Sequence, residues 1–97
     1  MTERAQLTVR DNREDDRFEA VDESGVVAGF SAYRRRGDRV VFTHTEVDDA
    51  FEGRGVGSTL VRGALDAVRD GGLRVVPLCP FVKSYIEQHP EYADLTV

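Results

Sequence analysis

Apolar and polar residues alternate along the first half of the chain in a way that predicts β-strands. Between residues 26 and 33, apolar side chains recur at every second position, which places them on one face of a strand: Val26, Ala28, Phe30 and Ala32. Residues 39–47 are mostly apolar or β-branched, and two shorter strand-like runs, at 6–10 and 17–21, flank a polar stretch that suits a turn. The pattern predicts four strands joined as an antiparallel meander.

From residue 59 onward the apolar spacing becomes that of helices. A helix is predicted over 59–68, and Asp70-Gly71-Gly72 should end it. Its apolar face consists of Leu60, Val61, Ala64, Leu65 and Val68. A fifth strand is expected at 73–76, and a last helix from Cys79 or Pro80 to about Gln88. Because a strand, a crossover helix and a strand form a βαβ unit, the fifth strand should run parallel to the one ending at Val47. The expected fold class is therefore α+β with a mixed sheet.

Length and composition narrow this picture to one small domain. With 97 residues and no linker-like segment, the chain is expected to form a single domain over 1–97, as a monomer or a weak homodimer. Cys79 is the only cysteine, which excludes an internal disulfide and leaves too few ligands for a Cys/His zinc site, so we expect no metal. The first residues lack the apolar core of a signal peptide and no apolar run is long enough to cross a bilayer. We therefore expect no membrane contact and a cytoplasmic location.

The charge balance argues against nucleic-acid binding. The net charge is −5, whereas binding to nucleic acid depends on many clustered basic groups. The one basic run, Arg34-Arg35-Arg36, is followed at once by Gly37-Asp38, which predicts a solvated hairpin between two strands. The acidic balance mildly favours basic partners.

The glycine-rich loop Glu52-Gly53-Arg54-Gly55-Val56-Gly57-Ser58 is a candidate anion site. Glycines at alternate positions let a backbone approach a ligand closely, and a helix that starts here directs unpaired N–H groups and its positive dipole end at an anion. The loop lacks the lysine of a Walker-type loop, and Gly55-x-Gly57 lacks the third glycine of a dinucleotide fingerprint. The loop is therefore predicted to bind the phosphates of a different ligand.

The same loop resembles motif A of the GNAT acyltransferases, which lies between the fourth strand and the following helix. Further segments extend the resemblance to a short, stand-alone GNAT branch and to nearly the whole chain: His44-Thr45-Glu46-Val47, Pro77-Leu78-Cys79-Pro80-Phe81-Val82 and His89-Pro90-Glu91-Tyr92. The resemblance implies a GNAT-like core, with acetyl-CoA as the acyl donor and an amine as the acceptor. Since this branch resembles a GNAT core without the early helices that usually help to bind the second substrate, the resemblance leaves the acceptor open.

The resemblance also implies a set of residues that bind CoA. In this set the pantetheine arm pairs with the strand end at Val47 and Asp48. The loop holds the pyrophosphate through Gly53, Arg54, Gly55, Val56, Gly57 and Ser58. Pro80 and Lys83 complete the set. A backbone N–H near Val47 could polarise the thioester carbonyl. Glu52 stands where the family usually has Arg or Gln, and because a carboxylate repels pyrophosphate we expect it to point to solvent.

Transfer of an acyl group to an amine also needs groups that move protons. Glu46 and His44 lie two residues apart on one strand face and are candidate bases; the alternative is a carboxylate paired with an arginine and a hydrogen-bonded sheet histidine. Cys79, near a helix N-cap, is a candidate covalent relay with His44 as its base, or a buried packing residue, or part of the thioester pocket. Tyr85, by resemblance, is placed to protonate the leaving thiolate, and its position on an apolar face also suits core packing.

These residues are compatible with three functions. The first is acetyl-CoA-dependent transfer of an acetyl group to a primary amine, such as a protein lysine or a small amine. The second is a non-catalytic module that binds CoA or acyl-CoA as a sensor or recruits a partner, and it gains support if His44, Glu46 and Cys79 do not converge. The third is a structural domain whose glycines only make a turn.

Overall fold

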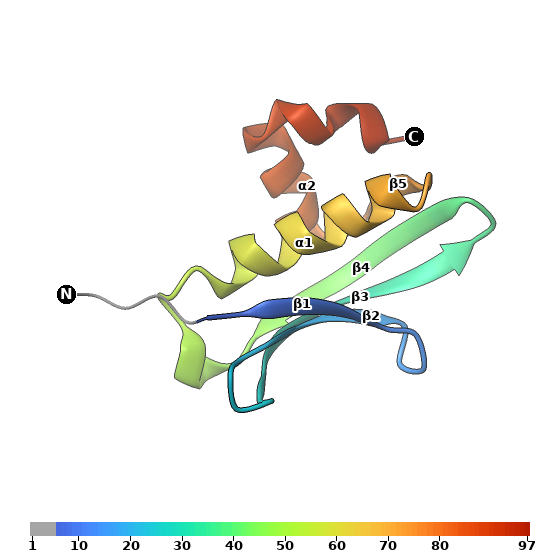
Figure 1. Cartoon of the computed structure of the whole chain (residues 1–97). Helices are drawn as coiled ribbons and strands as arrows, with labels where there is room; N and C mark the ends of the chain where they lie inside the picture. Colours follow the sequence, from blue (N-terminus) through green and yellow to red (C-terminus); the bar gives the residue numbers. More distant parts are fainter. Residues whose placement is uncertain (1–5) are drawn as a thin grey trace.

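The computed structural model describes residues 6–97 and shows a twisted sheet with helices packed on one side (Figure 1). Four strands form an antiparallel meander: β1 (Thr8–Asn12), β2 (Arg17–Val21), β3 (Val27–Arg36) and β4 (Arg39–Val47). The fifth strand, β5 (Arg74–Pro77), pairs with β4 in parallel, and the strand order is β1-β2-β3-β4-β5. The predicted fold class and the parallel fifth strand are confirmed.

Helical segments follow β4 and β5. They are the short 3-10 helix η1 (Asp49–Phe51), α1 (Val56–Asp70), α2 (Pro80–Gln88) and the 3-10 segment η2 (Pro90–Leu95). Helix α1 begins three residues before the predicted start at residue 59, because Gly55 takes a left-handed conformation that turns the chain directly into the helix. Strand β1 extends two residues beyond the predicted end at Arg10, because Asp11 and Asn12 pair with β2 and the turn is confined to residues 13–16.

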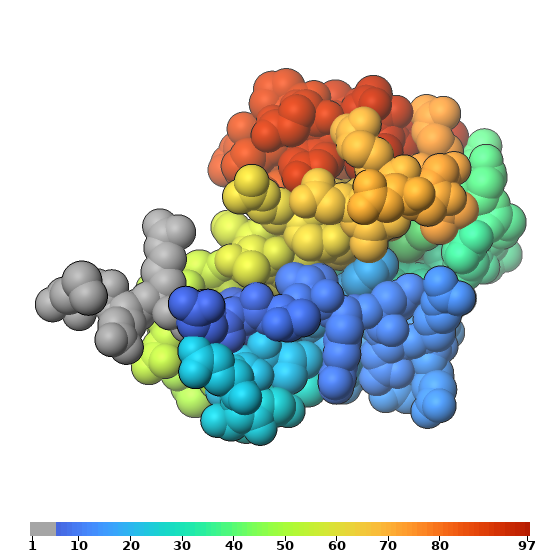
Figure 2. All heavy atoms as spheres, in the orientation of Figure 1, coloured from blue at the N-terminus to red at the C-terminus, as the bar shows by residue number. Residues whose placement is uncertain are grey.

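The core lies between α1 and the sheet. The predicted apolar face of α1 is buried: Leu60, Val61, Ala64, Leu65 and Val68 are at most 2% exposed. It meets a cluster of aromatic rings on the strands, in which Phe18 and Tyr33 lie 5.3 Å apart and Phe18 and Phe42 lie 6.1 Å apart. Figure 2 shows the later elements, coloured yellow to red, as a layer stacked against the blue N-terminal strands.

Strand β3 turns a different face toward the helices than its apolar alternation indicates. Gly29 lies against the start of α1, since a Cβ built there would be 3.2 Å from a methyl carbon of Val56, and Ser31 is fully buried. Of the predicted apolar face, Ala28 is fully buried and belongs to the core, whereas Phe30 and Ala32 alternate with Gly29 and Ser31 and lie on the other face. Val26 precedes the strand and is 49% exposed. Small residues are needed where α1 approaches the sheet closely, and an apolar pattern does not reveal that need.

The face of the sheet opposite α1 and α2 carries polar and aromatic side chains. Five side chains on β2, β3 and β4 are neighbours on this face: Arg17, Glu19, Phe30, His44 and Glu46. Within residues 6–97 no helix lies over it (Figure 1). We call it the open face. Any ligand that reaches these side chains can approach from solvent without displacing a helix.

Candidate functional site

The turn after β4 is built from short, specific hydrogen bonds. The Asp48 backbone N–H donates to the Ala28 carbonyl at 2.8 Å, and the Asp48 carboxylate accepts from the Ala50 N–H at 2.9 Å, which starts η1. Gly53 and Gly55 then take φ angles of 77° and 72°, and a Cβ at either position would meet only open space. The left-handed backbone therefore favours glycine at both positions, and the glycines leave the space before α1 clear.

The start of α1 has the properties of an anion site. Gly55 is the N-cap and supplies no side-chain hydrogen bond, and the first turn contains no acidic residue. The backbone N–H groups of that turn and the positive end of the helix dipole therefore favour a negative group. Arg54 stands beside this position, with its guanidinium 5.7 Å from the centre of the Phe51 ring, and both Ser58 and Glu52 are exposed. The exposure of Glu52 agrees with the expectation that it points to solvent.

Gly57 serves a different purpose from the other two glycines of the loop. It is buried, and a Cβ there would lie 2.6 Å from the tip of the Phe81 ring on α2. Gly57 therefore makes room for α2 to pack against the start of α1. The absence of a side chain is thus explained at this position by packing within the chain, and the contact of the Gly57 backbone with a phosphate stays a prediction.

Strands β4 and β5 separate halfway along β4. Their pairing ends at Phe42 and Pro77, after which the Cys79 N–H donates to the Phe42 carbonyl at 2.8 Å. Beyond that point β4 continues to Val47, and in the part of the chain that the structure describes these last residues pair only with β3. The opening leaves one backbone edge of β4 available to an extended ligand, beside the exposed Leu78 and Phe81.

His44 and Glu46 meet on the open face. The His44 Nε2 lies 3.4 Å from the Glu46 Oε1, and the two side chains are 59% and 61% exposed. They share a face, as their spacing predicts, and the ring of His44 also lies 6.1 Å from that of Phe30. The pair is thus accessible to a substrate, and its separation suits proton exchange through one bridging water or after a small side-chain movement.

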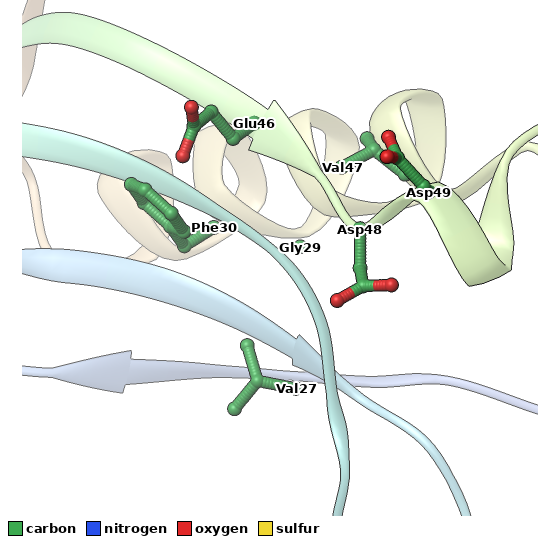
Figure 3. A pocket seen from close by; sticks show the side chains of 7 residues that line it. All are labelled: Val27, Gly29, Phe30, Glu46, Val47, Asp48 and Asp49. Atoms are coloured by element: carbon green, nitrogen blue, oxygen red, sulfur yellow. The ribbon is translucent and has the colours of Figure 1, made fainter.

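A pocket of about 340 Å³ opens next to this pair (Figure 3). Three carboxylates and several apolar groups line it: Val27, Gly29, Phe30, Glu46, Val47, Asp48 and Asp49. Figure 3 shows the Glu46 carboxylate beside the Phe30 ring, on neighbouring strands. Because no basic residue contributes to this lining, the pocket favours a cation that also offers apolar surface.

Cys79 lies on the side of the sheet away from His44. It is the N-cap of α2, is 2% exposed, and has its Sγ 3.4 Å from the Thr45 Oγ1, which lies 2.9 Å from the Ser31 hydroxyl. Successive residues of a strand point to opposite faces, so Thr45 turns toward Cys79 while His44 turns to the open face. The structure does not bring together the cysteine and the histidine that the relay hypothesis requires.

Tyr85 lies on α2 and is buried near α1 and η2. Its ring stacks on His89 with centroids 3.9 Å apart, and the side chain is 8% exposed. Burial raises the pKa of the Tyr85 hydroxyl above its ordinary value; Arg62 lowers it, and Glu91 and Asp66 raise it. The hydroxyl therefore holds its proton at neutral pH. The charged groups that act on it lie on α1 and η2, and not on β4.

The remaining predicted CoA-binding residues lie at the start of α2 and at its surface. Pro80 occupies the first helical turn, and Lys83 is exposed while its backbone N–H donates to the Cys79 carbonyl. Among residues 6–97 no group of three His, Cys, Asp or Glu side chains is arranged to hold a metal. No helix in the same range is both long and apolar enough to span a bilayer.

Sequence reasoning missed the β3 side of the pocket and Asp49. Phe30 and Val27 belong to an alternating strand, which predicts packing residues and carries no mark of a binding site. The residues that neighbour Phe30 on the same face of the sheet could have signalled the site. Glu19, His44 and Glu46 lie there on the adjacent strands, so the face is polar. To see that these residues are neighbours one must know the register between the strands, which the sequence alone does not provide.

Comparison with known proteins places these features in a family. A family model described as GCN5-related N-acetyl-transferase matches residues 17–95. Protein NATD1 of Homo sapiens is 37% identical over 59 residues, which are 60% of this chain and 52% of that protein. Protein NATD1 of Gallus gallus is likewise 37% identical over 59 residues, or 54% of its length. The chain thus spans about half the length of the curated relatives it matches.

Solved structures show the same fold. A GCN5-like protein from Staphylococcus aureus, described as a candidate N-acetyltransferase, superposes with a TM-score of 0.68 at 22% identity, covering 99% of this chain and 91% of that one. Nourseothricin acetyltransferase superposes with a TM-score of 0.50 at 20% identity, covering 79% of this chain and 60% of that one. At these identities the likeness concerns the fold.

Proposed function

The chain belongs to the GCN5-related N-acetyltransferase family, and on that premise we propose that it transfers an acetyl group from acetyl-CoA to a primary amine, of a protein lysine or of a small molecule. One observation carries the proposal. The turn between β4 and α1 leads into a helix start whose first turn has no acidic residue and favours an anion, and a carboxylate-lined pocket lies at the end of β4. A donor with phosphates and an acceptor with an ammonium group are the two ligands that such a turn suits.

The donor would bind along the β4 edge and at the start of α1. The first-turn N–H groups, Arg54 and Ser58 would hold the pyrophosphate, and Gly53 and Gly55 keep the approach clear. The pantetheine arm would pair with the free edge of β4 near Val47, with Lys83 and the start of α2 at Pro80 on the other side. The Asp48 N–H already donates to Ala28, so in this proposal Asp48 contributes through the shape of the turn.

The acceptor would enter the pocket from the open face. An alkylammonium group has an unperturbed pKa of about 10.4, so at neutral pH it must lose a proton before it can attack. The Glu46 carboxylate lines the pocket and contacts His44, and the pair can take that proton and release it to solvent. The neutral amine then attacks the thioester carbonyl and forms the C–N bond, and the C–S bond breaks as the thiolate leaves. The nitrogen then loses its second proton to solvent, which balances the proton that the thiolate takes up. Tyr85, which keeps its proton at neutral pH, stays a candidate acid for the thiolate.

Replacement of Glu46 by Gln tests the assignment of the base. We expect Glu46→Gln to lower kcat/KM for the amine by about 100-fold, because the amide keeps the shape and accepts no proton. The measurement is acetylation of a primary amine by acetyl-CoA, followed through release of the free thiol. Glu23→Gln, an exposed carboxylate in the turn before β3, is the matched control and should behave as wild type. Equal rates for the two variants would remove Glu46 from the mechanism.

Replacement of Cys79 by Ala separates direct transfer from a covalent relay. We favour direct transfer, because the Cys79 thiol contacts Thr45 and lies on the opposite side of the sheet from His44. The expected result is that Cys79→Ala keeps more than about half of the wild-type kcat and loses only about 1 kcal/mol of stability, as for removal of a small buried group. A loss of turnover with unchanged CoA binding would instead establish the relay.

A second candidate, a non-catalytic module that binds acyl-CoA, is favoured by the separation of Cys79 from His44 and Glu46. Thermal unfolding with CoA, acetyl-CoA and ATP tests the donor first, since a ligand at 100 times its dissociation constant stabilises by about 2.7 kcal/mol. Stabilisation by both CoA species with no acetylation of any primary amine supports the module. Absence of any shift with CoA and acetyl-CoA contradicts both functions.

A further inference from the structure

Glu19 is a buried carboxylate on the open face of the sheet. Its side chain is 2% exposed, and its neighbours on β1 and β2 compensate the charge. Arg10 lies 2.8 Å from one carboxylate oxygen, the Arg17 Nε lies 2.7 Å from the other, and the Asn12 amide donates at 3.1 Å. Three donors of this kind are what a carboxylate needs when it is withdrawn from water.

The charge on Glu19 is stable at neutral pH. Burial alone raises the pKa of the carboxyl, but the hydrogen bonds from Asn12, Arg10 and Arg17 outweigh burial and hold the pKa below its ordinary value. Glu19 therefore stays ionised and keeps both guanidinium groups in place. An ion pair of this kind fixes geometry more than it adds stability.

Arg17 connects this buried carboxylate to the acceptor pocket. Its guanidinium carbon lies 4.6 Å from the centre of the Phe30 ring. Phe30 is paired across the sheet with Glu19 on one side and Glu46 on the other, lines the pocket, and has its ring 6.1 Å from that of His44. A continuous set of contacts therefore runs from Glu19 through Arg17 and Phe30 to the His44–Glu46 pair.

Phe30 needs such a support because of where it lies. It is on the open face, where no helix in residues 6–97 packs over it, and it is only half-buried. A ring in this position is held mainly by what stacks on it, and a guanidinium fixed by a carboxylate can stack without moving. We infer that Glu19 is a positioning residue, which holds Arg17 on Phe30 and thereby sets the aromatic wall of the acceptor pocket. The inference rests on the proposed function, in that this pocket takes the amine.

Replacement of Glu19 by Gln tests the inference on the complete chain. We expect KM for the amine to rise about tenfold, equivalent to about 1.4 kcal/mol, while KM for acetyl-CoA and stabilisation by CoA stay unchanged. Glu14→Gln, an exposed carboxylate in the turn between β1 and β2, is the matched control and should match wild type in both. Equal KM values for the amine in these two variants would overturn the inference.

A second background shows whether Glu19 acts through Phe30. In Phe30→Leu the wall is already lost, so adding Glu19→Gln should raise KM for the amine no further. If the two substitutions instead multiply, Glu19 acts by another route and the inference fails. A rise in KM for both substrates alike would indicate general damage to the fold, which also contradicts a positioning role.

An NMR measurement keeps the inference separate from the proposed function. The Phe30 ring stands next to the imidazole of His44, so its ring current shifts the imidazole proton signals. We expect Glu19→Gln, and not Glu14→Gln, to move those signals toward their values in Phe30→Leu. If wild type transfers no acetyl group, the proposed function fails, and unmoved His44 signals in Glu19→Gln would overturn the inference by themselves.

Discussion

Gly55→Asp should abolish stabilisation by CoA while leaving the fold intact. Asp tolerates the left-handed conformation of Gly55, where φ is 72°, but it places a negative charge where the pyrophosphate is proposed to bind. Wild type should gain about 2.7 kcal/mol at a CoA concentration 100 times the dissociation constant, and the variant should gain nothing. The measurement is thermal unfolding with and without CoA, combined with acetyl transfer to an amine, which should fall to background.

Two variants control for strain and for bulk. Gly55→Asn has the same size and the same tolerance for the backbone without the charge, so it should keep part of the CoA-dependent shift. Gly37→Asp introduces the same residue at another left-handed glycine, with φ of 61° and open space around it, in the β3–β4 turn. It should respond to CoA as wild type does. A normal CoA shift in Gly55→Asp would show that the phosphates bind elsewhere.

Leu60→Ala should strongly destabilise the fold. Leu60 is fully buried between the helix and the sheet, so the substitution removes apolar contacts and leaves a cavity, at a loss of about 3 kcal/mol. For a domain of this size that loss corresponds to a fall in Tm of about 12 to 24 °C. Chemical denaturation and calorimetry measure it directly.

Leu78→Ala is the matched control for this substitution. It deletes the same atoms from a leucine that is 67% exposed, immediately after β5. We expect less than about 0.5 kcal/mol of change in the free energy of unfolding. If Leu60→Ala proved as mild as Leu78→Ala, the packing of α1 on the sheet described above would be incorrect.

The overall architecture was accessible from the sequence because it depends on periodicity. The apolar face of α1 repeats at helical spacing and is buried as predicted, and the change from alternating to helical spacing marks the crossover that makes β5 parallel. The loop at 52–58 was recognisable because its glycines recur at alternate positions, and the structure shows Gly53 and Gly55 in the left-handed conformation that favours glycine. Each of these signals is local, or repeats along a single element.

The arrangement of the site was less accessible because it depends on which faces meet. Glu46 and His44 were expected to share a face, and they do, since the spacing of two along a strand is itself a local rule. Whether Cys79 would meet His44 depended on which side of the sheet α2 covers, and the structure places Cys79 against Thr45 instead. Likewise, the need for glycine at position 57 is explained only by Phe81, which is distant in sequence.

By itself, then, the sequence determined the order of the strands and main helices, their class, the glycine-rich loop before α1, and a resemblance that the family match confirms. The tertiary structure alone decided that Phe30, Glu19 and Arg17 belong to the open face together with His44 and Glu46. The physical reason is that periodicity assigns residues to one of two faces of a strand but does not say which face the helices cover. That choice follows from packing between α1 and small residues such as Gly29, which only the folded chain reveals.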